Sequence, residues 1–249
     1  MPECLLQERG KMKIIGSDFD GRITTNKVIL PETRKQIKQF RDAGNIFIIV
    51  TGRSPQKFKD GIKKYDIDFF DYVICANGAV TLDQQLKVIN INKMDETTIM
   101  KIIQILFNDS NNKIITANTM SQSIVINNLE DLENIRNEII SFALEFDSIA
   151  QRKQYTFGQI ENINVFHNTR YTDILAKDIS KASELLKLFY QLKAEQLYTI
   201  GDGENDICML QCTDNSFTFN HVETVIKNSA QYHFDTIEQM LAFINKNHA

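Results

Sequence analysis

Apolar residues in this sequence gather in short runs, and stretches of helical periodicity separate them. Three such runs lie at residues 46–50, 72–76 and 197–200, and the first of them is apolar throughout. Strands show this pattern when helices cover both faces of a parallel sheet. A fourth apolar run begins at Ile14 and ends in Asp18-Phe19-Asp20-Gly21. The pattern predicts an α/β fold with a doubly wound, mostly parallel sheet.

The segments between these runs have the spacing of amphipathic helices. Ile37, Phe40 and Ala43 recur at helical intervals after Pro31, a residue that suits the first turn of a helix. Further helices are expected from about residue 54, over about 182–192 and 207–212, from Glu223, and over 237–244. Strands and helices therefore alternate at both ends of the chain, as doubly wound folds require.

The pattern changes after about residue 82, where strands follow one another with few helices between them. Strands are expected at 86–91, 113–118, 123–127, 160–166 and 171–175, and helices at 96–107 and 132–146. This order indicates an α+β unit inserted into the first domain. We therefore expect a core domain of residues 1–82 and 178–249 and an inserted cap domain of residues 83–177. Residues 1–11 are expected to be a flexible lead-in to the core.

Composition narrows the classes of function. The formal net charge is −4, so the chain lacks the basic field that attracts nucleic acid or anionic membranes. Its longest apolar runs have about half a dozen residues, far fewer than the ~20 that span a bilayer. The N-terminus lacks the apolar stretch of a secretory signal, and the four cysteines form no paired metal motif. We expect a cytoplasmic monomer or homodimer with no nucleic-acid or membrane partner.

Four carboxylates follow two of the expected strands. Asp18 and Asp20 come after the first, and Asp202 and Asp206 come after the strand at 197–200. The carboxyl ends of parallel strands meet at one edge of a sheet, so we expect all four in one crevice. Carboxylates this close repel one another unless a cation binds, and an all-oxygen ligand set favours Mg²⁺. Ca²⁺ and Mn²⁺ are the alternatives.

Groups that can bind a phosphoryl anion lie near these carboxylates in the expected fold. They are the Thr51 hydroxyl, the backbone at Gly52 and Gly21, the Lys181 ammonium and the Asn205 amide. An acidic nucleophile, a metal and anion donors together meet the requirements of phosphoryl transfer through an aspartyl-phosphate. The sequence therefore predicts an enzyme that catalyses phosphoryl transfer.

These motifs resemble those of the haloacid dehalogenase superfamily, and they occur in the same order. The four motifs are Asp18-Phe19-Asp20-Gly21, Thr51-Gly52-Arg53, Ser180-Lys181 and Gly201-Asp202-Gly203-Glu204-Asn205-Asp206. Asn77-Gly78-Ala79 and the inserted domain resemble the Cof-like phosphatases, which have a C2-type cap. The resemblance covers the chain from Lys13 onward and implies a phosphoric monoester hydrolase.

The resemblance also implies a role for each matched residue. Asp18 is expected to attack phosphorus, and Asp20 to protonate the leaving oxygen and then activate water. Mg²⁺ is expected to bind Asp18, the backbone carbonyl of Asp20, and Asp202, with Asp206 at or next to the ion. The residues expected to hold the phosphoryl group are Thr51, Gly52, Lys181 and Asn205. The substrates implied are small phosphorylated metabolites, sugar phosphates or similar monoesters.

The sequence departs from the family pattern at one position and leaves two other functions open. Arg22 stands where the family usually has threonine, so its guanidinium either reaches a substrate anion or points to solvent. A phosphotransferase such as a sugar phosphomutase has the same motifs. A non-catalytic phospho-relay or sensor also gathers aspartates, a threonine and a lysine at strand ends, but it has no use for Asp20 as an acid.

Overall fold

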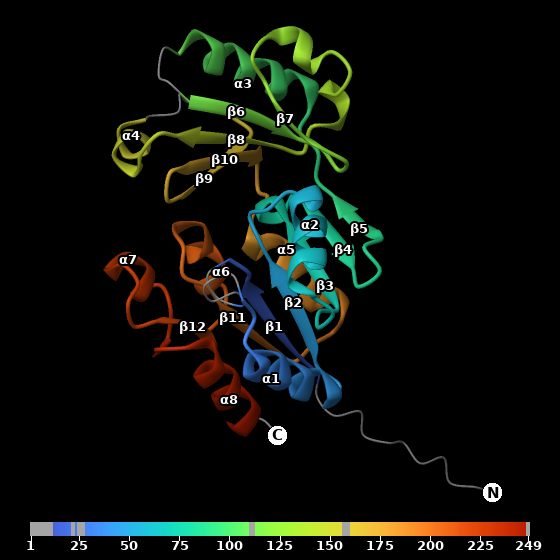
Figure 1. Cartoon of the computed structure of the whole chain (residues 1–249), viewed down its shortest axis with the longest axis vertical. Coiled ribbons are helices and arrows are strands. Elements are labelled where there is room, and N and C mark those ends of the chain that lie inside the picture. Colours follow the sequence, from blue (N-terminus) through green and yellow to red (C-terminus); the bar gives the residue numbers. More distant parts are fainter. Residues whose placement is uncertain (1–11, 21–22, 24–27, 110–112, 156–159, 248–249) are drawn as a thin grey trace, which may run out of the picture.

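The computed structural model describes residues 12–20, 23, 28–109, 113–155 and 160–247, and these residues form two sheets (Figure 1). The large sheet has eight strands. In spatial order they are β13 (Tyr232–Phe234), β12 (Ser216–Phe219), β11 (Gln196–Ile200), β1 (Lys13–Asp18), β2 (Ile46–Val50), β3 (Tyr72–Cys75), β4 (Val80–Asp83) and β5 (Val88–Ile91).

Strand β1 lies in the middle of the large sheet and pairs in parallel with β2 on one side and β11 on the other. The chain first extends the sheet through β2 and β3, and later returns to extend it through β11, β12 and β13. Among the described strands of this sheet, the antiparallel pairs are β3 with β4 and β4 with β5. The predicted doubly wound, mostly parallel sheet is confirmed. Its winding reverses between β1 and β11, which is where open α/β sheets bind ligands.

Helices cover both faces of the large sheet because its strands are apolar on both faces. Side chains alternate along a strand, so Ile14 and Ile15 of β1 belong to different buried clusters. The Ile15 cluster includes residues of α1 (Pro31–Asp42), α2 (Pro55–Tyr65) and α8 (Ile237–Asn247). The Ile14 cluster includes residues of α5 (Lys181–Gln191) and α6 (Ile207–Leu210). The remaining helix near this sheet is α7 (Thr224–Lys227).

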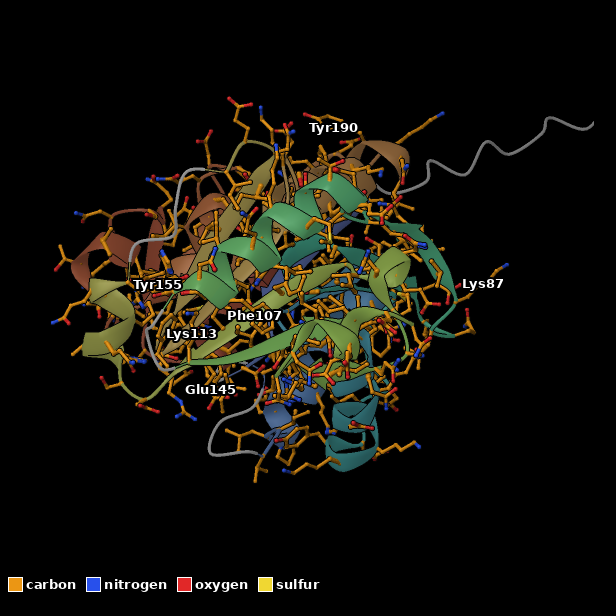
Figure 2. All side chains as sticks on the ribbon, turned by 90° about the horizontal axis from the view of Figure 1, so that it is seen from above. Lys87, Phe107, Lys113, Glu145, Tyr155 and Tyr190 are labelled. Atoms are coloured by element: carbon orange, nitrogen blue, oxygen red, sulfur yellow. The ribbon has the colours of Figure 1, made fainter. Side chains whose placement is uncertain are left out.

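The second sheet lies over the carboxyl ends of the large sheet's strands, and we call this sheet and its helices the cap layer (Figure 1). Its five antiparallel strands are, in order, β7 (Ser123–Val125), β6 (Lys113–Asn118), β8 (Ser141–Phe146), β10 (Tyr171–Ala176) and β9 (Ile163–Asn168). Helix α3 (Glu96–Asn108) covers the outer face, and α4 (Ile149–Gln154) follows β8 (Figures 1 and 2).

A separate apolar cluster holds the cap layer together. It joins Ile99 and Ile102 of α3 to Phe142 and Leu144 of β8. At the edge of the same sheet, Lys113 and Tyr155 lie close together (Figure 2), with the Lys113 Nζ 5.3 Å from the centre of the Tyr155 ring. The inner face of this sheet is left to face the large sheet.

The predicted helix at residues 132–146 is wrong, because 141–146 form β8 and 129–138 contain only short 3₁₀ turns. Ile135, Ile139, Phe142 and Phe146 have helical spacing, but Phe142, Leu144 and Phe146 also alternate as a strand requires. Pairing with β6 and β10 favours the strand. The structure also adds β4, β13 and α4, which the sequence pattern did not indicate.

The large sheet continues past residue 82 through β5, which pairs with β4. The division into a core of residues 1–82 and 178–249 and an inserted domain of 83–177 stays a prediction. Among the described residues, none of the helices combines the length and the apolar character needed to cross a bilayer.

Candidate active site

A cavity of about 570 Å³ lies between the large sheet and the cap layer. Most of the predicted site residues line it: Asp18, Asp20, Gly52, Asp202, Asn205 and Asp206. These side chains come from the ends of β1, β2 and β11, three neighbouring strands of the large sheet. Thr51 and Lys181 are fully or almost fully buried and lie next to these residues without lining the cavity.

Lys181 is the cation at the centre of this arrangement. It is the first residue of α5, and Ser180 caps that helix by accepting a hydrogen bond from the Ser183 N–H. The Lys181 Nζ donates to Asp18 Oδ1 at 2.7 Å and to Asp206 Oδ1 at 2.6 Å. Burial disfavours its charge, but the two carboxylates outweigh this effect and raise the pKa of Lys181. The lysine therefore stays charged and neutralises part of the acidic cluster.

Asp206 also fixes the loop that contains Asp202. Its Oδ2 accepts hydrogen bonds from the backbone N–H groups of Asp202 and Gly203, both at 2.9 Å. Both carboxylate oxygens of Asp206 thus have partners in the protein, one in the lysine and one in the loop. Asp206 serves as an anchor for this loop, whether or not it also contacts a metal.

Three of the four predicted carboxylates can converge on one cation. Carboxylate oxygens of Asp18, Asp202 and Asp206 lie within 4.8 Å of one another. Burial raises the pKa of Asp18 to about 7; Lys181 opposes this effect, and the charge of Asp206 adds to it. Three hard oxygen donors with only one lysine between them fit a divalent cation such as Mg²⁺.

Asp20 lies apart from this cluster and is paired with Arg53. The Arg53 Nε donates to Asp20 Oδ2 at 2.8 Å, and a second guanidinium nitrogen donates to Oδ1. The guanidinium carbon lies 4.8 Å from the centre of the Phe19 ring, a cation–π contact that helps to orient it. Arg53, the last residue of the second motif, therefore forms an ion pair beside the site. About half of the Asp20 side chain is exposed, and Asp20 lines the cavity.

A chain of side-chain hydrogen bonds links Asn205, a predicted phosphate-binding residue, to the cap layer through the buried Asn77. The Asn205 Nδ2 donates to Asn77 Oδ1 at 3.0 Å, and the Asn77 Nδ2 donates to Asp173 Oδ2 at 2.8 Å. Asn77 has a left-handed backbone (φ 50°), which asparagine tolerates better than most residues. Gly78 follows with φ +115°, and a Cβ there would lie 2.4 Å from the Ser180 carbonyl oxygen. This turn therefore packs directly on the start of α5.

Two further contacts join the cap layer to the edges of the site. Arg152 of α4 is buried and donates to Glu204 Oε2 at 2.9 Å, and its Nε donates to the Thr169 carbonyl. Glu204 belongs to the same loop as Asp202. On the other side, the Ser54 and Ser123 hydroxyls lie 3.0 Å apart. The cap layer is thus held to the large sheet on both sides of the cavity.

The sequence did not indicate Asp173 or Arg152 as site residues. Both belong to the cap layer and reach the site from the second sheet. Their place at the site depends on how the two sheets pack, which no local sequence pattern indicates. The Asn77-Gly78 pair carries a usable signal, because asparagine followed by glycine is typical of left-handed turns. The expectations for Gly21 and Arg22 lie outside the described residues.

Comparisons with known proteins agree with the chemistry of the site. A family model described as haloacid dehalogenase-like hydrolase matches residues 15–160 and 108–240. The chain is also similar to the 5-amino-6-(5-phospho-D-ribitylamino)uracil phosphatase YcsE of Bacillus subtilis (strain 168). The two are 24% identical over 231 residues, which cover 90% of each chain.

Solved structures have the same fold at low sequence identity. A phosphatase of the haloalkanoate superfamily from Bacteroides thetaiotaomicron, BT1666, has a TM-score of 0.75 at 17% identity, covering 98% of this chain and 97% of its own. The subclass IIB sugar phosphatase BT4131 has a TM-score of 0.76 at 18% identity, with 94% and 97% covered. These likenesses establish the two-layer fold over essentially the whole chain.

Proposed function

Because this chain belongs to the haloacid dehalogenase-like hydrolases and is a phosphoric monoester hydrolase, we propose that it removes phosphate from small phosphorylated metabolites through an aspartyl-phosphate at Asp18. Sugar phosphates or similar monoesters are the proposed substrates, and Mg²⁺ is the proposed metal. The observation that carries the proposal is the convergence of Asp18, Asp202 and Asp206 around the buried Lys181.

Asp18 is the proposed nucleophile because its carboxylate lines the cavity at the end of β1 and accepts a hydrogen bond from Lys181 at Oδ1. Its oxygen forms a bond to phosphorus while the bond from phosphorus to the leaving oxygen breaks. Lys181 favours the ionised form of Asp18 that this attack needs. The amides at Gly52 and Asn205 lie at the same cavity and can hold the oxygens of the phosphoryl group.

Asp20 is the proposed acid and base. In the first step its carboxyl gives a proton to the leaving oxygen. In the second step its carboxylate takes a proton from water while the water oxygen bonds to phosphorus and the Asp18–phosphorus bond breaks. Arg53 holds the Asp20 carboxyl group in place through two hydrogen bonds.

Asp18, the backbone carbonyl of Asp20, and Asp202 are the proposed ligands of the Mg²⁺ ion, with the loop of Asp202 held in place by Asp206. When bound, the ion offsets negative charge on the phosphoryl group and on the carboxylates. This proposal fits the donor set, which consists of oxygen atoms alone.

The proposal is tested by release of inorganic phosphate from a panel of sugar phosphates, with Mg²⁺ or with a chelator. We expect Asp18→Asn to lose all measurable turnover and Asp214→Asn, at an exposed aspartate outside the site, to keep it. Turnover that survives Asp18→Asn would contradict the mechanism. A product that retains its phosphate on another hydroxyl would indicate a phosphotransferase instead.

A further inference from the structure

Asp173 projects from the cap layer into the cavity, and one of its carboxylate oxygens accepts no hydrogen bond from the described residues. It lies on β10, directly opposite Ala143 of β8, and both residues line the cavity. Their neighbours along the strands, Phe142 and Ile174, point to the other side and join the apolar cluster under α3. The small side chain of Ala143 leaves room for a ligand beside the Asp173 carboxylate.

The two oxygens of Asp173 differ in their surroundings. Oδ2 accepts the hydrogen bond from Asn77, but Oδ1 has no hydrogen-bond partner among the described residues. Asn118, a cap-layer amide that also lines the cavity, is already bonded to the hydroxyls of Ser123 and Ser141. Asn168, Thr169 and Tyr171 also line the cavity from the cap layer, but among the described lining residues of this layer Asp173 is the one carboxylate.

We propose that Asp173 determines specificity by accepting a hydrogen bond from a hydroxyl group of the substrate's leaving group. This inference rests on the proposed function and adds the chemistry of the group that leaves. A carboxylate withdrawn from water is costly unless a donor meets it, and a hydroxyl supplies a short, charge-assisted bond.

The charges around the cavity favour a neutral polyol over a charged leaving group. Lys57, from α2, lines the same cavity and offsets the charge of Asp173. Arg53 likewise pairs with Asp20, so this part of the cavity has balanced charges. A second phosphate or a carboxylate on the leaving group would then face the second oxygen of Asp173 without a further cation. The substrate class that fits is a sugar or sugar-alcohol monophosphate with free hydroxyls.

The hydrogen-bond chain explains why this residue is well placed for the role. Asp173 is tied through Asn77 to Asn205, the amide proposed to hold the phosphoryl group. The distance between the two ends of the substrate site is therefore fixed by side chains and not only by the position of the cap layer. A leaving group of the right length can reach Asp173 while its phosphate lies at Asp18.

The test compares two phosphate esters of equal carbon number, ribitol 5-phosphate and n-pentyl phosphate, which differ in their hydroxyls. We expect the unaltered protein to prefer the ribitol ester in kcat/KM. Asp173→Ala should reduce this preference by about 10- to 100-fold, the value of a hydrogen bond to a charged group. Hydrolysis of the pentyl ester should change by no more than about threefold.

Two further variants make the result decisive. Asp173→Asn can keep the bond to Asn77 through its amide oxygen while losing the charge, so it should fold and show an intermediate preference. Asp147→Ala makes the same change as the alanine variant at an exposed cap-layer aspartate and should keep the full preference. An unchanged preference in both Asp173 variants would refute the role of Asp173 and leave the proposed phosphatase activity intact. If the unaltered protein released no phosphate from either ester, the proposed function would fall with it.

Discussion

Replacing the buried Lys181 with methionine tests how the acidic cluster is held in the folded protein. Methionine fills much of the space of the lysine side chain but carries no charge. The change leaves Asp18 and Asp206, which are 7% and 1% exposed, without the cation that both contact. We expect Lys181→Met to destabilise the metal-free protein strongly at pH 8.

The size of the effect follows from the burial of the group. Removing one partner of a buried ion pair costs about 3–5 kcal/mol, a large part of the 5–15 kcal/mol that holds most domains folded. An exposed lysine contributes little by comparison. Lys177, four residues earlier and exposed, is the matched control, and Lys177→Met should change the free energy of unfolding by less than about 1 kcal/mol.

The stability lost in Lys181→Met should depend on pH, and the pKa of Asp18 sets the direction of this dependence. Burial raises the pKa of Asp18 to about 7 in the folded protein, above its ordinary value, and removing Lys181 raises it further. A carboxyl with a raised folded-state pKa contributes stability at low pH that is lost as the pH rises through that value. The difference between Lys181→Met and the unaltered protein should therefore be smaller at pH 5 than at pH 8.

The assay is urea unfolding followed by circular dichroism, since the chain has no tryptophan for fluorescence. A chelator keeps the protein metal-free, and a second series with Mg²⁺ should recover part of the loss because a cation replaces the missing charge. The reasoning is refuted if Lys181→Met is as stable as Lys177→Met at pH 8, or if its deficit is the same at both pH values.

Three other predictions concern the cap layer and the Asn77-Gly78 turn of the large sheet. Arg152→Met removes the ion pair with Glu204 that joins the cap layer to the large sheet, and it should lower kcat/KM about tenfold. Lys153→Met, at the exposed neighbouring residue, should leave kcat/KM unchanged, and equal kcat/KM values for the two variants would contradict this prediction. Gly78→Ala should lower the free energy of unfolding by at least ~2 kcal/mol more than Gly44→Ala, because both have positive φ but only Gly78 is crowded; equal losses by urea unfolding would refute this. Burial raises the pKa of Asp173 to about 6, so the preference for ribitol 5-phosphate over pentyl phosphate should fall as the pH drops from 7 to 5, and a constant ratio would count against a carboxylate acceptor.

The large sheet could be predicted because its signals are local. An apolar run that ends in Asp18, or in Gly201 and Asp202, marks both a strand and the edge where it stops. The structure brings these predicted residues to one cavity, although their chemical roles stay predictions. Lys181 was predicted at a helix start, but its contact with two carboxylates depends on how α5 packs against β1.

The cap layer was harder to predict, for two physical reasons. Its strand β8 has apolar residues at positions that suit a helix and a strand equally, so only pairing with neighbouring strands decides. Asp173 and Arg152 reach the site from another layer, and the sequence does not tell which face of a cap strand or helix points toward the large sheet.

The most direct test of the central claim is to identify the residue that becomes phosphorylated during turnover. The protein is mixed with substrate and Mg²⁺, quenched in acid and reduced with borohydride, which converts an aspartyl-phosphate to homoserine, and its peptides are analysed by mass spectrometry. We predict homoserine in place of aspartate at residue 18 alone. Reduction at another aspartate, or no reduced aspartate in a protein that turns over substrate, would contradict the account.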